Sequence, residues 1–348
     1  KVILKLYRRL RAGEQPDVEV ARFLTEVAGY EHTPRFLGLA SHGEGAEETT
    51  LAAAFAFVTN RGDAWRGIFD ALVRDLGEHE AWTDSEAAEP QPQPDAFPFP
   101  LSIGALLGQR TAELHRAFAV ETDDPAFKTE PLTAEHLTQW VQQTVTEAEA
   151  LVTSLKTQRP GVAEAILPLA EAVIAARDPL VERVRRVAGF EPSGSLSRIH
   201  GDYHLGQVLL AQNDVAIIDF EGEPKRGLEE RRAKSSPLRD VAGMLRSFDY
   251  AAESALLRHV ESFGPASERA AARAEAWRVA ASAEFLEAWR KTAEGADNLP
   301  QDPALTDALL DLFLLQKAIY EAGYELGMRP AWLGIPLQGL LDLLGDDA

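Results

Sequence analysis

The segment from Ser195 to Glu223 reads SLSRIHGDYHLGQVLLAQNDVAIIDFEGE, and the interpretation of the whole chain starts from it. A polar turn containing Asp202 and Gln207 precedes a short apolar run, and after a second turn another apolar run ends at Asp219. Two such runs joined by a turn favour an antiparallel hairpin, in which the loop before one strand lies beside the end of its neighbour. We therefore predict that these three side chains lie near one edge of a sheet.

Two carboxylates and an amide oxygen in this order suit phosphoryl transfer. Mg²⁺ prefers oxygen ligands and keeps several waters, so one carboxylate and one amide suffice when nucleotide phosphates supply the rest. Protein kinases use an Asp that orients the acceptor hydroxyl, a metal-binding amide five residues later and a metal-binding Asp at a later strand end. By this order Asp202 is the candidate catalytic residue, and Gln207 and Asp219 are the candidate Mg²⁺ ligands.

Three runs carry a more specific resemblance: IHGDYHLGQVLL at 199–210, IIDFEGEP at 217–224 and SSPLRDVAGMLRSFDYA at 235–251. They resemble bacterial maltokinases, including the form fused to trehalose synthase, within the aminoglycoside-phosphotransferase-like group. The resemblance implies an α+β, two-lobed, protein-kinase-like fold with a truncated small β-rich lobe and a large, mainly helical lobe. ATP and Mg²⁺ are the implied cofactors.

The composition is compatible with this assignment and excludes several others. A chain of 348 residues fits two or three packed lobes. The formal net charge of −20 argues against nucleic acid and anionic membrane as partners, because both would repel such a surface. The absence of cysteine excludes disulfides and thiolate metal sites, and no apolar run is long enough to span a bilayer. We expect a cytoplasmic protein.

The first residues predict a strand followed by a helix. Val2–Tyr7 is apolar except for Lys5, and 16–28 has Pro16, early acids and apolar residues at helical spacing. A strand lysine with a helix glutamate is the kinase arrangement that holds ATP phosphates, so the resemblance assigns Lys5 to the nucleotide and Glu19 as its ion-pair partner. The alternatives are a solvated edge lysine and an acid that interacts with the helix dipole.

The order of elements suggests where the two lobes meet. A strand is expected at 51–58, and its end, Phe57 and Val58, falls where kinases have the hinge that meets adenine. This divides the chain into a small lobe, 1–60, and a helical lobe, 61–348. The chain starts without Met in an apparent strand, and the resemblance implies a cap subdomain upstream, so we expect a fragment that lacks this cap.

Irregular connections are expected at two places, a polar turn at 43–48 and a proline-rich surface segment at 86–100. The last third reads as almost entirely helical. Arg110 and His115, in an earlier predicted helix over 101–119, are further candidates for the sugar pocket by resemblance.

Aromatic and acidic residues gather near the end of the chain. Tyr320 and Tyr324 are one helical step apart, as are Glu321 and Glu325, so each pair shares a face. Carboxylates can accept hydrogen bonds from sugar hydroxyls, and an aromatic ring can cover the apolar face of a pyranose. The alternative is that the aromatic residues pack the final helix. By resemblance the expected sugar-binding residues are His204, Glu321, Tyr324, Glu325, Arg329 and Trp332.

Three functions remain open from the sequence. The first is ATP-dependent phosphorylation of maltose to maltose 1-phosphate, which would feed glycogen and α-glucan synthesis from trehalose. The second is a kinase for another acceptor, such as glucosamine or an aminoglycoside. The third is a non-catalytic sugar-binding module of a fused trehalose synthase. The expected partners are maltose, as the small-molecule sugar, and trehalose synthase through fusion or association, with neither nucleic acid nor membrane.

Overall fold

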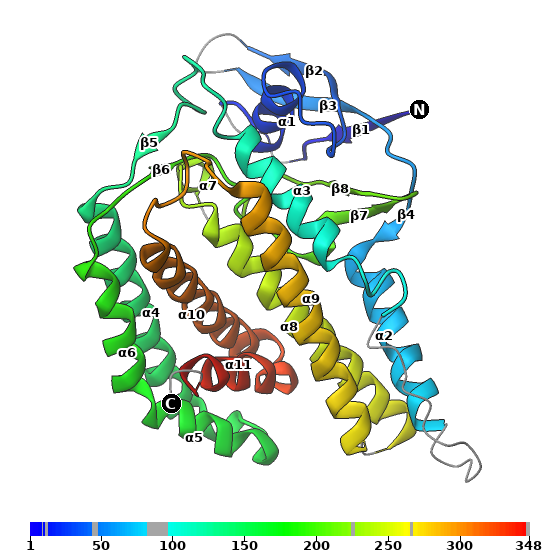
Figure 1. Cartoon of the computed structure of the whole chain (residues 1–348), viewed down its shortest axis with the longest axis vertical. Helices are drawn as coiled ribbons and strands as arrows, with labels where there is room; N and C mark the ends of the chain where they lie inside the picture. Colours follow the sequence, from blue (N-terminus) through cyan, green and yellow to red (C-terminus); the bar gives the residue numbers. More distant parts are fainter. Residues whose placement is uncertain are drawn as a thin grey trace. The chain divides into compact units, whose positions relative to one another are not determined.

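A computed structural model gives the fold of the chain (Figure 1). The residues that it describes are 1–8, 10, 13–43, 48–81, 97–223, 227–264 and 267–345. Most of the turn expected at 43–48, and the proline-rich segment up to residue 96, lie outside them. Contacts divide the chain into two units: the first comprises 1–129, 197–235 and 251–296, and the second comprises 130–196, 236–250 and 297–348.

The first unit begins with a three-stranded antiparallel sheet. Its strands are β1 (Val2–Leu6), β2 (Phe36–His42) and β3 (Thr49–Ala56), in the order β1-β3-β2. Lys5 lies opposite Ala53 in this ladder. Helix α1 (Pro16–Glu26) starts at its proline. Proline lacks a backbone N–H, which is harmless here because an N–H in the first turn of a helix has no intrahelical acceptor. The strand and helix predicted for the first residues are confirmed.

A second sheet contains the predicted hairpin. Its strands are β4 (Asn60–Asp63), β7 (Val208–Ala211) and β8 (Val215–Ile217), in the order β4-β7-β8. Val208 pairs with Ile217, and both side chains are buried, which fixes the register because a one-residue slip would turn the apolar side chains outward. The prediction of an antiparallel hairpin is confirmed.

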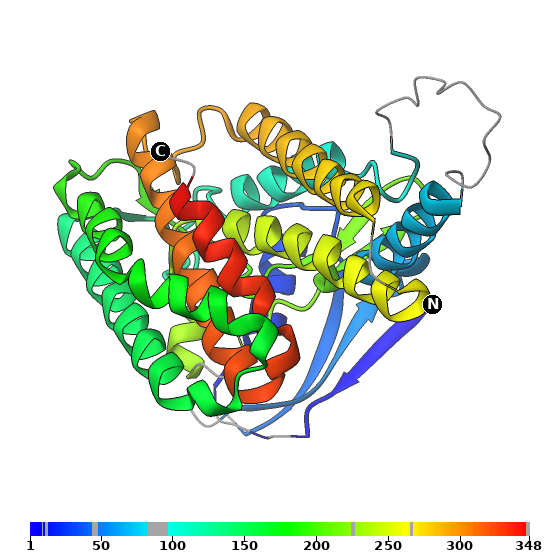
Figure 2. The ribbon, with the colours of Figure 1, turned by 90° about the horizontal axis from the view of Figure 1, so that it is seen from below.

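Helices complete the first unit: α2 (Ala64–Ala81), α3 (Gly104–Ala117), α7 (Leu228–Arg232), α9 (Glu268–Ala293) and the second half of α8 (Leu238–Phe263). Figures 1 and 2 both show α3 and α9 side by side. Gly108 allows this approach, because a β-carbon there would stand 2.1 Å from the carbonyl oxygen of Phe285 on α9. The indole of Trp289, also on α9, donates to His115 on α3.

The second unit is mainly helical. It consists of α4 (Ala134–Gln158), α5 (Leu167–Ala175), α6 (Arg177–Arg186), the first half of α8, α10 (Pro303–Met328), α11 (Gly334–Gly345) and a short β5–β6 pair, Glu130–Pro131 with Ser195–Leu196. Pro160 and Gly161 lie in a 3₁₀ turn, η3 (Arg159–Gly161), after α4. No helix in the described ranges is long and apolar enough to cross a membrane.

Candidate active site

His200 connects the segment that carries Asp202 to the strand that leads to Asp219. One ring nitrogen, Nε2, lies 2.9 Å from the carbonyl oxygen of Ile218, and the backbone N–H of Asp202 points to Nδ1 at 3.4 Å. A carbonyl oxygen can only accept and an amide N–H can only donate, so this geometry requires the proton on Nε2. Gly201 takes the left-handed backbone conformation (φ +80°) that this tight turn needs.

Gln207 and Asp219 come together as the hairpin predicts. The backbone N–H of Ile218 donates to the carbonyl oxygen of Gln207 at 2.9 Å, so the ladder continues to the last residue before Asp219. The Gln207 amide nitrogen lies 3.4 Å from the Asp219 carboxylate. Among the described residues, Asp219 is the only non-glycine with positive φ, +67°. Such a backbone costs of order 1 kcal/mol or more and is typical of functional positions.

The Lys5 ammonium group lies among three carboxylates. Its Nζ atom is 2.9 Å from Asp17 and 3.4 Å from Asp219, and it also donates to Glu221. Burial lowers the pKa of Lys5, but the three acids raise it by more, so the group is a permanent cation. The phenol of Tyr7 donates to the same Asp17 oxygen at 2.5 Å, and burial together with Asp17 raises the pKa of Tyr7.

The expected ion pair between Lys5 and Glu19 is wrong. Glu19 is buried and accepts from Arg198 at 2.8 Å and from Arg232 at 3.0 Å. The reason is helix geometry: residues two apart on α1 point in different directions, so Asp17 reaches Lys5 while Glu19 points away from it. Asp17 is therefore the helix partner of the strand lysine.

Besides Asp17, sequence reasoning missed two residues of the group around Lys5, Tyr7 and Glu221, and a signal was present for one of them. Lys5 and Tyr7 lie two apart on or just after β1, and residues at that spacing in an extended chain point to the same side. A search for same-side partners would therefore have added Tyr7 to the site. Asp219 and Glu221 are also two apart, but Asp219 has a positive φ and Glu221 lies in a turn, so the strand rule gives no signal for Glu221.

His204 has a local partner at the start of the 3₁₀ turn η6 (Leu205–Gln207). Its Nδ1 accepts from the backbone N–H of Gly206 at 3.0 Å, so the ring caps this turn. This 3₁₀ turn ends at Gln207. The expected contact of His204 with sugar stays a prediction.

Phe57 and Val58 follow β3 directly, as expected for a connection between the two sheets of the first unit. The backbone N–H of Phe57 donates to the carbonyl oxygen of Lys1 at 3.1 Å, and the Val58 carbonyl oxygen accepts from the Asn60 side chain at 2.9 Å. Their contact with adenine stays a prediction.

Arg110 and His115 have structural partners within the first unit. Arg110 binds Asp214, in the turn of the β7–β8 hairpin, through two hydrogen bonds of 2.8 Å. His115 is only 1% exposed and accepts from the Trp289 indole at 3.0 Å. Both side chains brace the fold, and the sugar-pocket role expected for them stays a prediction.

The predicted acidic residues of the second unit carry internal arginine partners. Glu321 accepts from the buried Arg246 at 2.9 Å, and burial raises the pKa of Glu321 although Arg246 opposes the shift. Glu325, 2% exposed, accepts from Arg329 at 2.9 Å and from the phenol of Tyr250 at 3.4 Å. Both acids thus belong to a connected charged network on α8 and α10.

Arg329 also forms the centre of an aromatic group. Its guanidinium lies 4.8 Å from the ring centre of Trp332 and 5.6 Å from that of Tyr324. The two rings are partly exposed and Arg329 is exposed. The structure therefore brings together Tyr324, Glu325, Arg329 and Trp332, with Glu321 in the adjacent network. That they bind sugar stays a prediction.

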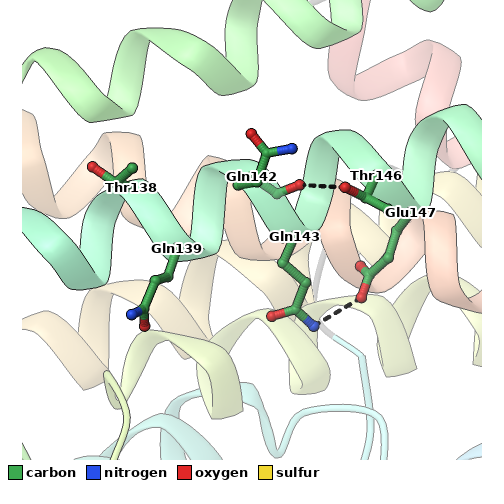
Figure 3. Close-up of a pocket in the computed structure, with 6 residues that line it drawn as sticks. All are labelled: Thr138, Gln139, Gln142, Gln143, Thr146 and Glu147. Carbon is green, nitrogen blue, oxygen red and sulfur yellow. Dashed lines mark hydrogen bonds between the residues drawn. The ribbon is translucent and has the colours of Figure 1, made fainter.

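A separate hollow lies along α4 in the second unit (Figure 3). Its lining residues all come from this one helix: Thr138, Gln139, Gln142, Gln143, Thr146 and Glu147. Their polar groups are satisfied locally, since Gln143 donates to Glu147 and Thr146 donates to the carbonyl oxygen of Gln142, both at 2.8 Å. None of the predicted site residues lines it.

Within the ranges that the structure describes, His, Asp and Glu side chains form no group of three or more arranged to hold a metal ion. A magnesium site with one carboxylate, one amide and several waters does not need such a group.

Comparisons with known proteins match the whole chain to sugar kinases. No protein-family model matches. The chain is 29% identical over 352 residues to the glucosamine kinase of Streptacidiphilus jiangxiensis, covering 98% of the chain and 69% of that protein. It is 29% identical over 272 residues to the glucosamine kinase of Mycolicibacterium smegmatis, covering 76% of the chain and 60% of that protein.

Solved structures give the same result for the fold. A glucosamine kinase crystal structure superimposes with a TM-score of 0.77 at 25% identity, covering 100% of this chain and 74% of that one. A glucosamine kinase in complex with glucosamine, ADP and inorganic phosphate gives 0.76 at 26% identity, covering 99% and 72%. The predicted fold class is therefore confirmed: the chain has the kinase-like α+β fold, mostly helical with a small sheet-containing part.

Proposed function

We propose that this protein is an ATP-dependent sugar kinase and that its acceptor is an amino sugar of the glucosamine class. The observation that carries the kinase proposal is the grouping of Lys5, Gln207 and Asp219, with His200 joining the Asp202 turn to the same strand end. A cation, an amide and a carboxylate placed in this way suit a nucleotide whose phosphates carry a divalent ion.

The residues present fit Mg²⁺. Asp219 is half exposed, its carboxylate already attracts one cation, the Lys5 ammonium, and an amide lies beside it. Gln207 and Asp219 would hold the ion, which when bound would neutralise charge on the nucleotide phosphates. Lys5 would orient those phosphates, and Asp202 would accept the proton of the sugar hydroxyl. Such a site works mainly by alignment and charge stabilisation.

We propose glucosamine rather than maltose as the acceptor because both relatives and both solved structures described above are named glucosamine kinase. One of these structures contains glucosamine. Acids close to the predicted sugar residues are compatible with an amine. Maltose remains the competing acceptor because the runs at 199–210 and 217–224 resemble maltokinases. A connection to trehalose synthase and glycogen synthesis depends on that second acceptor.

The test is coupled ADP release by the natural full-length protein with Mg²⁺ and ATP. Glucosamine, maltose and an aminoglycoside are compared, and Asp202→Asn provides the blank. We expect the highest kcat/KM for glucosamine. Preference for maltose would reject the amino-sugar assignment, and no turnover of any acceptor would reject the kinase proposal.

A further inference from the structure

Helix α1 is held from two sides in its first turn. On one side, Asp17 binds the Lys5 ammonium and the Tyr7 phenol. On another side, Glu19 binds two arginines, Arg198 and Arg232. Both acids are at most 5% exposed. The position of this one turn therefore determines where Lys5 is held.

The two arginines come from segments that flank the proposed chemistry. Arg198 lies 179 residues from Glu19 in the sequence and immediately precedes the turn that carries His200 and Asp202. Arg232 lies 213 residues from Glu19, at the end of α7, which follows the segment of Asp219 and Glu221. One carboxylate group thus joins three separate segments.

Aromatic stacking reinforces the same connection. Phe23 of α1 stacks on Phe127 with ring centres 3.8 Å apart and planes 2° from parallel. The Arg198 guanidinium lies 5.2 Å from the ring centre of Phe127. Arg198 is therefore fixed to α1 both through its charge and through this stack.

Stability alone does not explain a buried ion group of this kind. Burying charged groups is costly, and apolar residues of similar size often stabilise a fold equally well or better. In addition, Arg198 Nε is buried without a hydrogen-bond partner in the described part of the chain. This ion group is costly to bury and connects three segments of the proposed site. Its role in positioning those segments explains it better than a contribution to stability.

We propose that Glu19 is a positioning residue of the phosphoryl-transfer site, which sets α1 against the Asp202 and α7 segments and thereby places Asp17 and Lys5. The inference rests on the proposed kinase function. Glu19 touches neither nucleotide nor sugar in this role. Its effect reaches the nucleotide only through Asp17 and Lys5, so it concerns ATP and not the acceptor.

The test uses Glu19→Gln in the natural full-length protein. This substitution keeps the shape of the side chain and removes the charge that both arginines need. Arg232→Gln is a second variant, because Arg232 is at the edge of the group and its loss leaves the Arg198 contact in place. Asp75→Asn is the matched control, since it breaks an ion pair with Arg273 in the same unit, at 2.8 Å, away from α1.

We expect Glu19→Gln to lower kcat/KM for ATP and the affinity for Mg-ADP by about 2- to 30-fold, the range seen for residues that act through others. Arg232→Gln should act in the same direction with a smaller effect. KM for the sugar should change by less than about twofold, and Asp75→Asn should lower Tm without changing the affinity for Mg-ADP.

A Lys5→Met background separates positioning from a general loss of structure. If Glu19 acts through Lys5, Glu19→Gln should add little to the loss already caused by Lys5→Met. Equal effects of Glu19→Gln in both backgrounds, or a fall in Tm with unchanged ATP kinetics, would overturn the inference while leaving the kinase proposal intact. A wild-type protein that neither binds Mg-ADP nor turns over a sugar would overturn both.

Discussion

Gly108 permits the close packing of α3 on α9 in the first unit, and Gly108→Ala tests how much depends on it. A β-carbon at this position would stand 2.1 Å from the carbonyl oxygen of Phe285 and 3.0 Å from the backbone nitrogen of Trp289. Both contacts are with backbone, which cannot rotate away as a side chain can. The β-carbon and the Phe285 carbonyl oxygen would therefore have to move apart by about 1.3 Å or more to reach ordinary van der Waals distances.

The expected destabilisation follows from two opposing effects. Overpacking of a core costs about 1–3 kcal/mol, and a clash with backbone belongs at the upper end. Replacing a helical glycine by alanine contributes about 1 kcal/mol in the other direction. The net loss is about 2 kcal/mol, which lowers Tm by about 4–8 °C in a domain of this size.

The shift also reaches the proposed site. The α3 residues beside Gly108 hold the segment that carries Asp202 and the hairpin after it. Arg110 binds Asp214 in the hairpin turn, and the Thr111 hydroxyl lies 2.8 Å from the phenol of Tyr203, the residue after Asp202. A displaced α3 moves both partners. We therefore expect reduced kcat at temperatures where the variant remains folded.

The assay compares wild type and Gly108→Ala in thermal unfolding and in steady-state turnover. Gly77→Ala in α2 is the matched control, because its β-carbon would meet only the ring edge of Phe263, at an ordinary 4.0 Å. This control should have an unchanged or higher Tm. If Gly108→Ala is as stable and as active as the control, the close packing of α3 on α9 does not support the site and the reasoning is refuted.

Further predictions concern individual side chains. Asp202→Asn should lower kcat by about 10² or more with an unchanged circular dichroism spectrum, and retention of most activity would exclude a general-base role. Lys5→Met should raise KM for ATP by roughly 10-fold or more, since a charge-assisted hydrogen bond is lost, and an unchanged KM would remove Lys5 from the nucleotide site. Trp332→Ala should raise KM for the sugar by roughly tenfold and leave KM for ATP unchanged, whereas the opposite pattern would contradict a sugar contact. Burial raises the pKa of Glu19, but the arginine hydrogen bonds lower it by more, to below its ordinary 4.5. Its contribution to stability is then complete above pH 4.5 and lost as the pH falls through the lowered pKa, because the unfolded chain binds the proton more readily. The difference in urea midpoint between wild type and Glu19→Gln should therefore shrink on acidification, and a constant difference would show that the charge is irrelevant.

Local features of the fold could be predicted from the sequence because the chain itself fixes them. The hairpin of β7 and β8 follows from two apolar runs and a turn, and its register places Gln207 opposite Ile218 without help from distant residues. Pro16 likewise marks the first residue of α1. Patterns of two to four residues determine these features.

The ion pairs could not be predicted in the same way, because their partners are distant in the sequence. The analogy with kinases assigned Lys5 to a glutamate, yet an aspartate two residues earlier on α1 faces it. That choice depends on the rotation of α1 about its axis. Arg198 and Arg232 bind Glu19 on the side of α1 away from Lys5, and the sequence of 1–28 contains no information about either arginine.

The proposed function gives a strongly acidic protein an anion, ATP, as its substrate, and the charges around Lys5 bear on how it would be bound. Asp17, Asp219 and Glu221 surround a single ammonium group, so the cluster without ligands has more negative than positive charge. Free nucleotide phosphates would be repelled by this cluster, as by a chain with a net charge of −20. A divalent cation reverses the balance, because it adds positive charge at the one half-exposed carboxylate that already lies beside an amide, Asp219. In the proposed function, the excess of acids would select the metal complex of the nucleotide over the free nucleotide, and the buried Asp17 would keep Lys5 in place for it.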